Sequence, residues 1–230
     1  MVWRQARSRP SGNCSATPQR PCCRTPTARA SRPGYAGGMH PAMKHPLAHG
    51  FAVLRPVQPH DLTRWLSYLG TDEVRQGISW RPRSTHELQE FVHSTDLRGP
   101  APQVRFAIVR SDDDAMLGSI GLHSISLRHR SAEIGYDIAP EQWGQGLATA
   151  ACRAIVAWAR LQGFTRIQAT VLVGNEASLR VLERAGFERE GCLRQYRWID
   201  GRACDVLVYG NVPPAPPADT GPPRPDCSGL

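Results

Sequence analysis

The segment from Trp143 to Thr149 has the composition of a phosphate-binding loop. It reads Trp-Gly-Gln-Gly-Leu-Ala-Thr, and it lies between a strand-like segment at 132–136 and a helical pattern. Glycine lets a backbone approach a ligand closely because it has no Cβ. The first amides of a helix have no partner within the helix and lie at the positive end of its dipole. The spacing therefore predicts a cradle for a phosphate or pyrophosphate, with an ordinary glycine turn as the alternative.

The elements after this loop alternate between helix and strand. Gly163 ends a predicted helix of about four turns, whose inner face consists of apolar residues at helical spacing: Leu147, Ala151, Ala154, Ile155 and Trp158. Residues 167–173 are rich in β-branched side chains and predict a strand. Asn175 then opens a second helix, which Gly186 ends. The loop is thus held between a strand and two helices.

In order and spacing, these motifs resemble the GNAT superfamily of acyl-CoA-dependent N-acyltransferases. The superfamily signature is Gln/Arg-x-x-Gly-x-Gly/Ala, and residues 143–148 match it except that Trp143 replaces the usual Gln or Arg. Together with Asn175-x-x-Ser178 and the segment 186–191, the pattern is similar to the RimJ/RimL-like branch. Members of that branch acetylate protein N-termini, notably of ribosomal proteins, and some act on other amines.

The resemblance implies a fold and a donor. The fold is α/β (α+β), with a mixed, mostly antiparallel sheet flanked by helices, and the strands on either side of the loop splay apart around pantetheine. Acetyl-CoA is the implied cosubstrate. Asn175 is expected to form a hydrogen bond with pantetheine, although asparagine is also a preferred helix N-cap. The expected cofactor-binding residues are Ile138, Trp143, Gly144, Gln145, Gly146, Leu147, Ala148, Thr149 and Asn175.

The implied chemistry is direct transfer, in which a neutral amine attacks the thioester and a carboxylate takes its proton. Glu133, in an Ala-Glu-Ile context before the loop, is the first candidate for the base, with a salt-bridged strand glutamate as the alternative. Many relatives use a tyrosine as the acid, but Leu182 occupies that position here. Ser178 is the candidate that takes its place, with Tyr196 and Tyr209 in reserve.

The acceptor is expected to bind near residues 191–205, where Arg194, Tyr196, Trp198 and Asp205 are candidates. The resemblance to the RimJ/RimL-like branch makes a protein N-terminus the first hypothesis. An α-amino group (pKa about 8) would also demand less of a base than lysine does (pKa about 10.4). The alternatives are a small amine, such as an aminoglycoside, a polyamine or an amino acid, and a non-catalytic module that binds acyl-CoA or contacts RNA. Cys152 has no histidine placed to activate it, so an acyl-cysteine route is not expected.

The upstream region predicts the remaining elements. Strands are expected at 51–55, 105–110 and 116–123, with an aspartate-rich turn at 111–114. One helix runs through Leu62, Trp65, Leu66 and Leu69, and Thr85 caps another. Alternation places Glu133 and Asp137 on one face of their strand, opposite Ile134, Tyr136 and Ile138.

Composition divides the chain into an acetyltransferase domain at 48–210 and two low-complexity tails. The net charge of +8 equals the eight basic residues within 1–50, a stretch that has no acidic residue. The rest of the chain is balanced, so nucleic-acid binding by the domain is not expected. The Arg/Pro/Ser-rich extension at 1–47 has three interpretations: a disordered or untranslated segment before Met39 or Met43, a transit peptide, and an RNA- or membrane-binding arm. The proline-rich segment 211–230 is expected to be disordered.

Cysteine and histidine usage predicts neither a disulfide framework nor a metal site. The seven cysteines contain no Cys-x-x-Cys pair, and the eight histidines form no cluster with ligand spacing. A reducing cytoplasm is the default location, and no apolar run approaches the roughly 20 residues of a membrane span. The sequence leaves the oligomeric state open between monomer and dimer.

Overall fold

The computed structural model describes residues 45–47, 50–92, 94, 97 and 102–214. Eight strands form one sheet in the order β1-β2-β3-β4-β5-β6-β8-β7. The predictions for residues 1–44 and 215–230 lie outside the described residues. The strands are β1 (His45–Pro46), β2 (Ala52–Pro56), β3 (Val104–Arg110), β4 (Met116–Ser126), β5 (Ser131–Ile138), β6 (Arg166–Leu172), β7 (Glu188–Ile199) and β8 (Arg202–Asn211).

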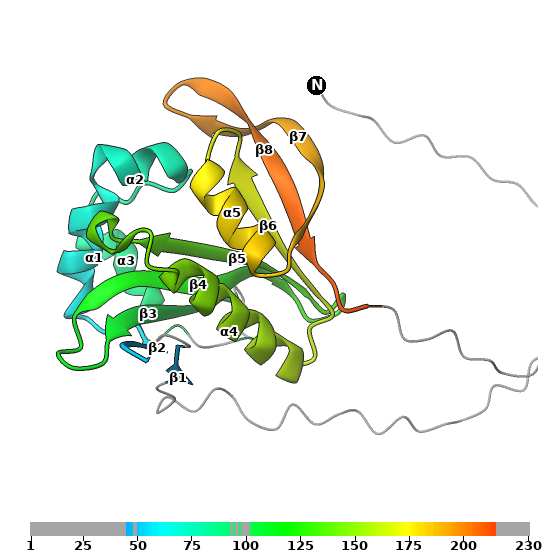
Figure 1. Ribbon diagram of the computed structural model, residues 1–230. Helices are drawn as coiled ribbons and strands as arrows, with labels where there is room; N and C mark the ends of the chain where they lie inside the picture. The colour runs from blue at the N-terminus through cyan, green and yellow to red at the C-terminus, as the bar shows by residue number, and fades with distance from the viewer. Residues whose placement is uncertain (1–44, 48–49, 93, 95–96, 98–101, 215–230) are drawn as a thin grey trace, which may run out of the picture. The chain divides into compact units, whose positions relative to one another are not determined.

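The helices form two groups. Figure 1 shows α4 and α5 next to each other, apart from the group formed by α1, α2 and α3. The helices are α1 (Asp61–Leu69), α2 (Asp72–Gly77), α3 (Thr85–Leu88), α4 (Leu147–Leu161) and α5 (Glu176–Arg184), with single 3₁₀ turns η1 (Gln89–Phe91) and η2 (Pro140–Gln142).

Two hydrophobic cores lie on opposite faces of the sheet, and the alternation of strand residues explains them. On β3, Phe106 and Ile108 belong to the core that contains Leu147 and Ile155 of α4. Ala107 and Val109, which alternate with them, belong to the core with the α1 and α3 residues Leu62, Trp65, Tyr68, Leu69 and Leu88. Successive strand side chains point to opposite faces, so one strand serves both helical layers.

The sheet opens between β5 and β6. These two strands pair in parallel from Ser131–Arg166 to Glu133–Gln168. Beyond that point β5 continues to Ile138, and β6 pairs with β8 on its other side up to Leu172. The other strand pairs in the described sheet are antiparallel. The mixed, mostly antiparallel sheet and the separation of the two strands agree with the expectation.

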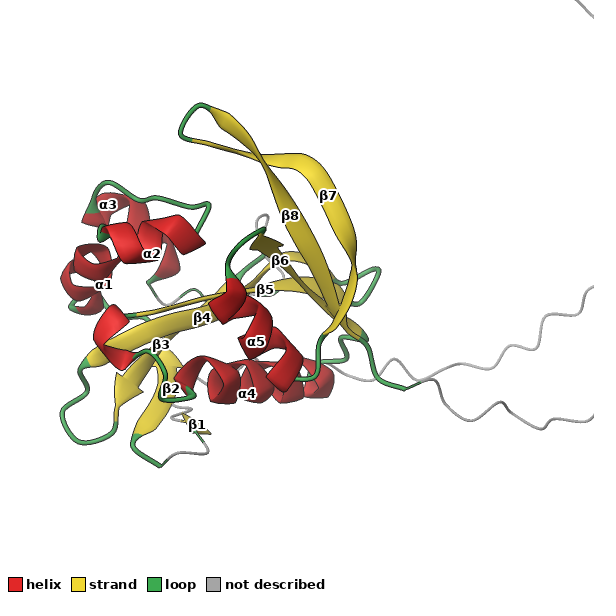
Figure 2. Cartoon of the chain, turned by 45° about the horizontal axis from the view of Figure 1, so that its top comes forward, coloured by secondary structure: helices red, strands yellow, loops and turns green. Residues whose placement is uncertain are grey.

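The β7–β8 hairpin extends past the rest of the sheet, as Figure 2 shows. Its turn contains Asp200 (φ 49°) and Gly201 (φ 76°). Arg81, in the loop between α2 and α3, forms an ion pair with Asp200 and donates from Nη2 to the Arg75 carbonyl at 3.0 Å. The hairpin tip is therefore linked to the helical group that contains α2.

Three details differ from the sequence-based expectations. Ser84, not Thr85, is the N-cap of α3: its backbone is extended, and its hydroxyl accepts the Glu87 N–H at 3.4 Å. The helix α2 was not predicted, because its short stretch Asp-Glu-Val-Arg-Gln-Gly buries Val74 alone and has no apolar periodicity. The packed region also extends slightly beyond 48–210, since Leu47 is 3% exposed and Asn211 ends β8.

Candidate active site

The glycine-rich loop leads into α4 in the conformation that a phosphate cradle requires. Gly144 and Gly146 both have φ of 77°, a left-handed conformation that glycine adopts at little cost. Gly146 is the N-cap of α4, and no side chain caps this end of the helix. The first amides of α4 are therefore available to an anion.

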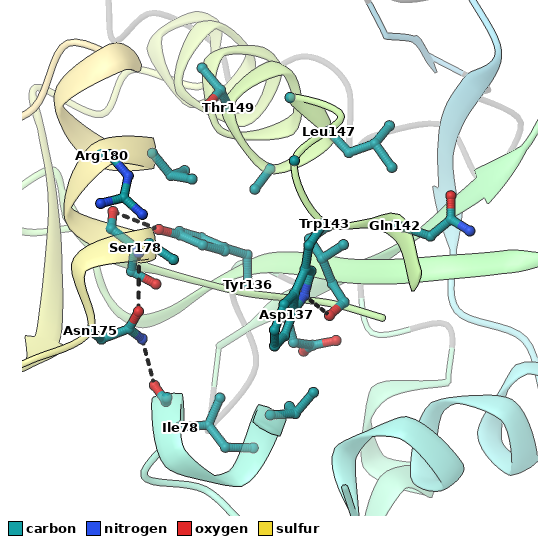
Figure 3. Close-up of a pocket in the computed structure, with 18 of the residues that line it drawn as sticks. Ile78, Tyr136, Asp137, Gln142, Trp143, Leu147, Thr149, Asn175, Ser178 and Arg180 are labelled. Carbon is teal, nitrogen blue, oxygen red and sulfur yellow. Dashed lines mark hydrogen bonds between the residues drawn. The ribbon is translucent and has the colours of Figure 1, made fainter. Parts of the chain in front are cut away.

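A cavity of about 450 Å³ lies against this loop (Figure 3). Its walls come from the loop, from α2 and from one side of α5. The Trp143 indole Nε1 donates to the Ile138 carbonyl at 2.8 Å, which fixes the ring against the cavity while 49% of the residue stays exposed. Trp143 thus fills the usual Gln or Arg position with a ring anchored to the end of β5.

Two arginines of α5 line the same cavity, and sequence reasoning missed both. Arg180 and Arg184 lie on the α5 side that also presents Ala177 and Val181. Both residues add positive charge to the lining of the cavity that also borders the start of α4. Arg180 and Arg184 lie three and seven residues after Ala177, and this helical spacing could have indicated that they share one helix face.

A second cavity, of about 470 Å³, adjoins the first. Six residues line both cavities: Gly77, Ile78, Tyr136, Asp137, Asn175 and Ser178. The second cavity extends from this boundary to Trp80, Phe91 and Trp198, in the α2–α3 region and on β7. Two ligands bound in the two cavities would therefore meet beside Tyr136 and Ser178.

Glu133 lies in the second cavity and is 7% exposed. Its carboxylate accepts from Thr170 Oγ1 at 2.6 Å and from Gln168 Nε2 at 3.5 Å, and Arg197 Nη2 is 3.9 Å away. The carboxylate is thus bonded to β6 and also borders a cavity, so both sequence-based interpretations of Glu133 describe part of its surroundings.

His123 lies opposite Glu133 in the β4–β5 register and lines the same cavity. Burial lowers the pKa of the imidazole below its usual range, while the negative charge of Glu133 acts in the other direction. The imidazole Nδ1 is 3.1 Å from Ser124 Oγ.

Asp137 is a buried carboxyl that sequence reasoning placed on the correct strand face without assigning it a role. It is 8% exposed and accepts from Tyr68 Oη at 2.5 Å, Ser119 Oγ at 2.7 Å and Trp65 Nε1 at 3.1 Å. Burial raises the pKa of this carboxyl, against the effects of Arg105 and the three donors. These bonds hold α1 against β5 at the boundary of the two cavities.

Asn175 and Ser178 organise the start of α5. Asn175 Oδ1 accepts the Ser178 N–H at 3.1 Å, and its Nδ2 donates to the Gly77 carbonyl at 3.0 Å, both drawn in Figure 3. Asn175 is therefore an N-cap that also connects α5 to α2. The Tyr136 hydroxyl donates to the Ser178 carbonyl at 3.3 Å, and burial raises the pKa of this phenol.

Comparison with known proteins decides the family. The acetyltransferase (GNAT) domain family matches residues 52–188. The chain belongs to the GNAT acetyltransferases. The N-acetyltransferase YoaA of Bacillus subtilis is 42% identical over 155 residues, which cover 67% of this chain and 82% of YoaA. The putative ribosomal N-acetyltransferase YdaF of the same organism is 40% identical over 168 residues, which cover 68% of this chain and 88% of YdaF.

A solved structure with the same fold contains coenzyme A. The spermidine N-acetyltransferase from Vibrio cholerae, in complex with CoA and spermine, aligns with a TM-score of 0.61 at 25% identity, over 70% of this chain and 95% of that chain. The predicted family, fold and enzyme class are therefore confirmed for this acetyltransferase.

All but one of the residues expected to bind acetyl-CoA line the first cavity. Ile138, Trp143, Gly144, Gly146, Leu147, Ala148, Thr149 and Asn175 line the first cavity. Gln145 does not: its exposed side chain donates to the Glu141 carbonyl at 3.4 Å and to Gln142 Oε1 at 3.3 Å. If Gln145 binds the donor, it does so through its backbone. The binding roles of all these residues remain predictions.

Only some of the expected catalytic and acceptor residues line the two cavities. Glu133 lines the second cavity and Ser178 lines both, whereas Tyr196 and Tyr209 line neither. Of the acceptor candidates, Trp198 lines the second cavity. Asp205 accepts the Gln195 N–H at 2.7 Å within the hairpin, and Arg194 lies with Tyr196 at a separate hollow on β7.

Cys152 is fully buried, and burial raises the pKa of its thiol well above the usual range. It is not among the residues that line either cavity. Within the described part of the chain, no group of three or more His, Cys, Asp or Glu side chains is arranged to hold a metal ion. In the same part, no helix is both long enough and apolar enough to cross a membrane.

Proposed function

We propose that this acetyltransferase moves an acetyl group from acetyl-CoA to the α-amino group of a protein N-terminus, by direct attack in a ternary complex. The observation that carries the proposal is the meeting of two cavities at Tyr136, Asp137 and Ser178. One cavity borders the glycine loop and the other contains Glu133. This arrangement suits a donor and an acceptor that react at the common boundary.

The residues of the first cavity fit the diphosphate of coenzyme A. Gly144 and Gly146 leave the backbone accessible, and the amides at the start of α4 supply hydrogen-bond donors. Arg180 and Arg184 add charges that attract the phosphates. The gap between β5 and β6 beyond Glu133 is the place for the pantetheine arm, as in the family.

In the proposed reaction Glu133 takes a proton from the acceptor ammonium, directly or through water, and so frees the nitrogen lone pair. The lone pair forms a bond to the thioester carbonyl carbon, the carbon–sulfur bond breaks with its electron pair going to sulfur, and the nitrogen loses its second proton to solvent to give the neutral amide. The Ser178 hydroxyl donates a hydrogen bond to the departing thiolate. Ser178 suits this role because it lines both cavities and because its own N–H and carbonyl are held by Asn175 and Tyr136.

The charges of the second cavity favour a monoamine over a polyamine. Two arginines, Arg105 and Arg197, balance two carboxyl groups, Glu133 and Asp137, so the cavity has no excess of negative charge. Polyamines and aminoglycosides carry several positive charges and need an excess of negative charge. A peptide N-terminus brings a single amine.

The rim of the second cavity also suits a peptide. Trp198, on β7, lines the cavity and is 75% exposed, whereas Tyr196 and Leu193, 50% and 40% exposed, lie at a separate hollow on the same strand. Exposed aromatic residues beside a cavity are typical of surfaces that contact another protein. The chain that follows the acetylated residue would lie along this rim.

Two measurements test the proposal. Calorimetry should detect coenzyme A binding to the purified protein. Release of free thiol from acetyl-CoA should then be faster with short peptides that have a free N-terminus than with spermidine or an aminoglycoside. Faster release with either amine would assign this site to small molecules, and tight binding without turnover on any acceptor would make the protein a binding module.

A further inference from the structure

The floor of the second cavity is a row of residues across three strands. In the sheet register Arg105 lies opposite Gly121, and Gly121 lies opposite Gly135. A Cβ on Gly135 would be 3.3 Å from His123 Nε2 and 4.0 Å from Arg105 Nη2. The missing side chain of Gly135 therefore lets the His123 ring and the Arg105 guanidinium lie close to the backbone of β5.

Arg105 is held rigidly in this position. Its Nη1 donates to the Gly135 carbonyl at 3.0 Å and to Ser119 Oγ at 3.4 Å. Its guanidinium carbon lies 5.4 Å from the centre of the Phe91 ring and 5.8 Å from that of Trp65. Aromatic faces stabilise a cation without consuming its N–H donors.

Arg105 carries a full positive charge without a direct carboxylate partner. Within the described residues, no Asp or Glu lies at salt-bridge distance from it, and Asp137 is connected to it through the Ser119 hydroxyl. Arginine stays protonated in proteins. A cation that lines a cavity beside a glycine is suited to an oxygen atom of a ligand.

We propose that Arg105 determines the acceptor class by binding the carbonyl or carboxylate oxygen next to the acceptor amine. The inference rests on the proposed function and narrows it to α-amino carbonyl compounds, which are peptide N-termini and amino acids. Glu133 and Gly135 are two residues apart on one strand face, a separation of about 6–7 Å. The amine nitrogen and carbonyl oxygen of one residue, roughly 3 Å apart, can lie between Glu133 and the Arg105 guanidinium.

The test uses two acceptors, alaninamide and isopropylamine, that differ only in the carboxamide group, which is a methyl group in isopropylamine. Once rates are corrected to the concentration of neutral amine, the difference between the two acceptors measures the contribution of the carboxamide group. Wild-type protein should prefer alaninamide. Arg105→Gln should lower kcat/KM for alaninamide by about ten- to a hundredfold, the effect of one charge-assisted hydrogen bond. The loss with isopropylamine should be clearly smaller.

Three further variants keep the test decisive. Arg105→Lys should restore part of the preference, because it keeps the charge and loses the planar fork. Arg110→Gln makes the same change at the solvent-facing end of β3 and should not alter selectivity. Gly135→Ala should raise KM for alaninamide, since its methyl group fills the floor without changing any charge. Coenzyme A affinity and melting temperature are measured for each variant.

Equal losses with both acceptors, or no loss with either, would overturn the role of Arg105 even if peptides are acetylated. An alanyl peptide and free alanine complete the panel. Suppose that Arg105→Gln loses the preference for alaninamide and that the wild-type protein acetylates free alanine but not the alanyl peptide. This result would support the role of Arg105 and would contradict a protein N-terminus as the acceptor. Failure of wild-type protein to bind coenzyme A would contradict the proposed function itself.

Discussion

The two adjoining cavities are built from different parts of the chain. The donor cavity has one wall made of backbone, in the loop between Trp143 and Thr149 and at the start of α4, and its other walls come from α2, β5 and α5. The acceptor cavity is formed by side chains from β3, β4, β5, β6 and β7 and from the loop before α3. Backbone N–H groups can donate hydrogen bonds whichever side chains the loop carries. Most side-chain substitutions in the loop should therefore leave the affinity for coenzyme A unchanged. Acceptor selectivity should instead change with single side chains such as Arg105 and Glu133.

The largest expected effect separates chemistry from donor binding. Glu133→Gln should lower kcat by about a hundred- to ten-thousandfold, the usual contribution of a general base, while coenzyme A affinity stays unchanged. The loss should be greatest below the pKa of the acceptor amine and should shrink above it, where the amine is already neutral. A pH–rate profile of both proteins measures this difference. A small effect independent of pH would remove Glu133 as the base.

Gly146→Val should produce the converse result, with donor binding lost. A β-branched residue is strained at φ of 77°, and its side chain obstructs the amides of α4. Several charge-assisted hydrogen bonds of about 1.5–3 kcal/mol each would be lost, so coenzyme A affinity should fall on the order of a hundredfold or more. Titration calorimetry measures the change. Gln145→Ala is the matched control in the same loop and should bind normally, because that side chain lies outside the cavity.

Asn175→Ala should affect both cavities moderately, because Asn175 lies on their common boundary. The substitution removes the N-cap of α5 and the bond to the Gly77 carbonyl, which together should lower the free energy of unfolding by about 1–2 kcal/mol. Chemical denaturation measures the loss. Ser84→Ala, which removes the cap of α3 away from this boundary, should lower stability and leave coenzyme A affinity intact. Equal affinities in both variants would show that the link between α5 and α2 is not needed for binding.

The smallest effect is expected from an ion pair outside both cavities. Arg166 Nη1 donates to Glu190 Oε1 at 2.8 Å and lowers the pKa of that carboxyl. A carboxyl whose pKa is lowered by folding stabilises the protein above its unfolded pKa, and this contribution is lost as pH falls through the folded pKa. Glu190→Gln should therefore cost less than about 1 kcal/mol at neutral pH, and nothing in acid. Melting curves at several pH values test this, and a loss that persists in acid would point to packing instead.

The segment from the glycine loop through α5 is the part of the fold that sequence patterns predicted well. Helix α4, strand β6 and helix α5 lie where apolar spacing and the glycines at 163, 174 and 186 placed them. These signals are local, because a helix face or a strand face is visible within a dozen residues. Helix α2 was missed because six residues with one buried side chain carry no such signal.

The acceptor side was predicted only in part. Glu133 was found through its position before the loop, but Arg105, His123 and Asp137 were not assigned to the site. Arg105 and Gly135 are 30 residues apart in sequence and in hydrogen-bond contact in space. Their proximity depends on the registers of β3 with β4 and of β4 with β5, which shift at bulges that residue patterns do not reveal.

The sequence by itself determined the family, the donor loop and the elements that hold it, because glycine conformation, helix capping and apolar periodicity are properties of neighbouring residues. Only the tertiary structure decided which side chains surround the acceptor and how their charges balance. Segments from residue 69 to residue 206 converge on that cavity. The electrostatic character of a cavity depends on distances through space, and these are fixed only when the sheet has formed its registers and the helices have packed on its two faces.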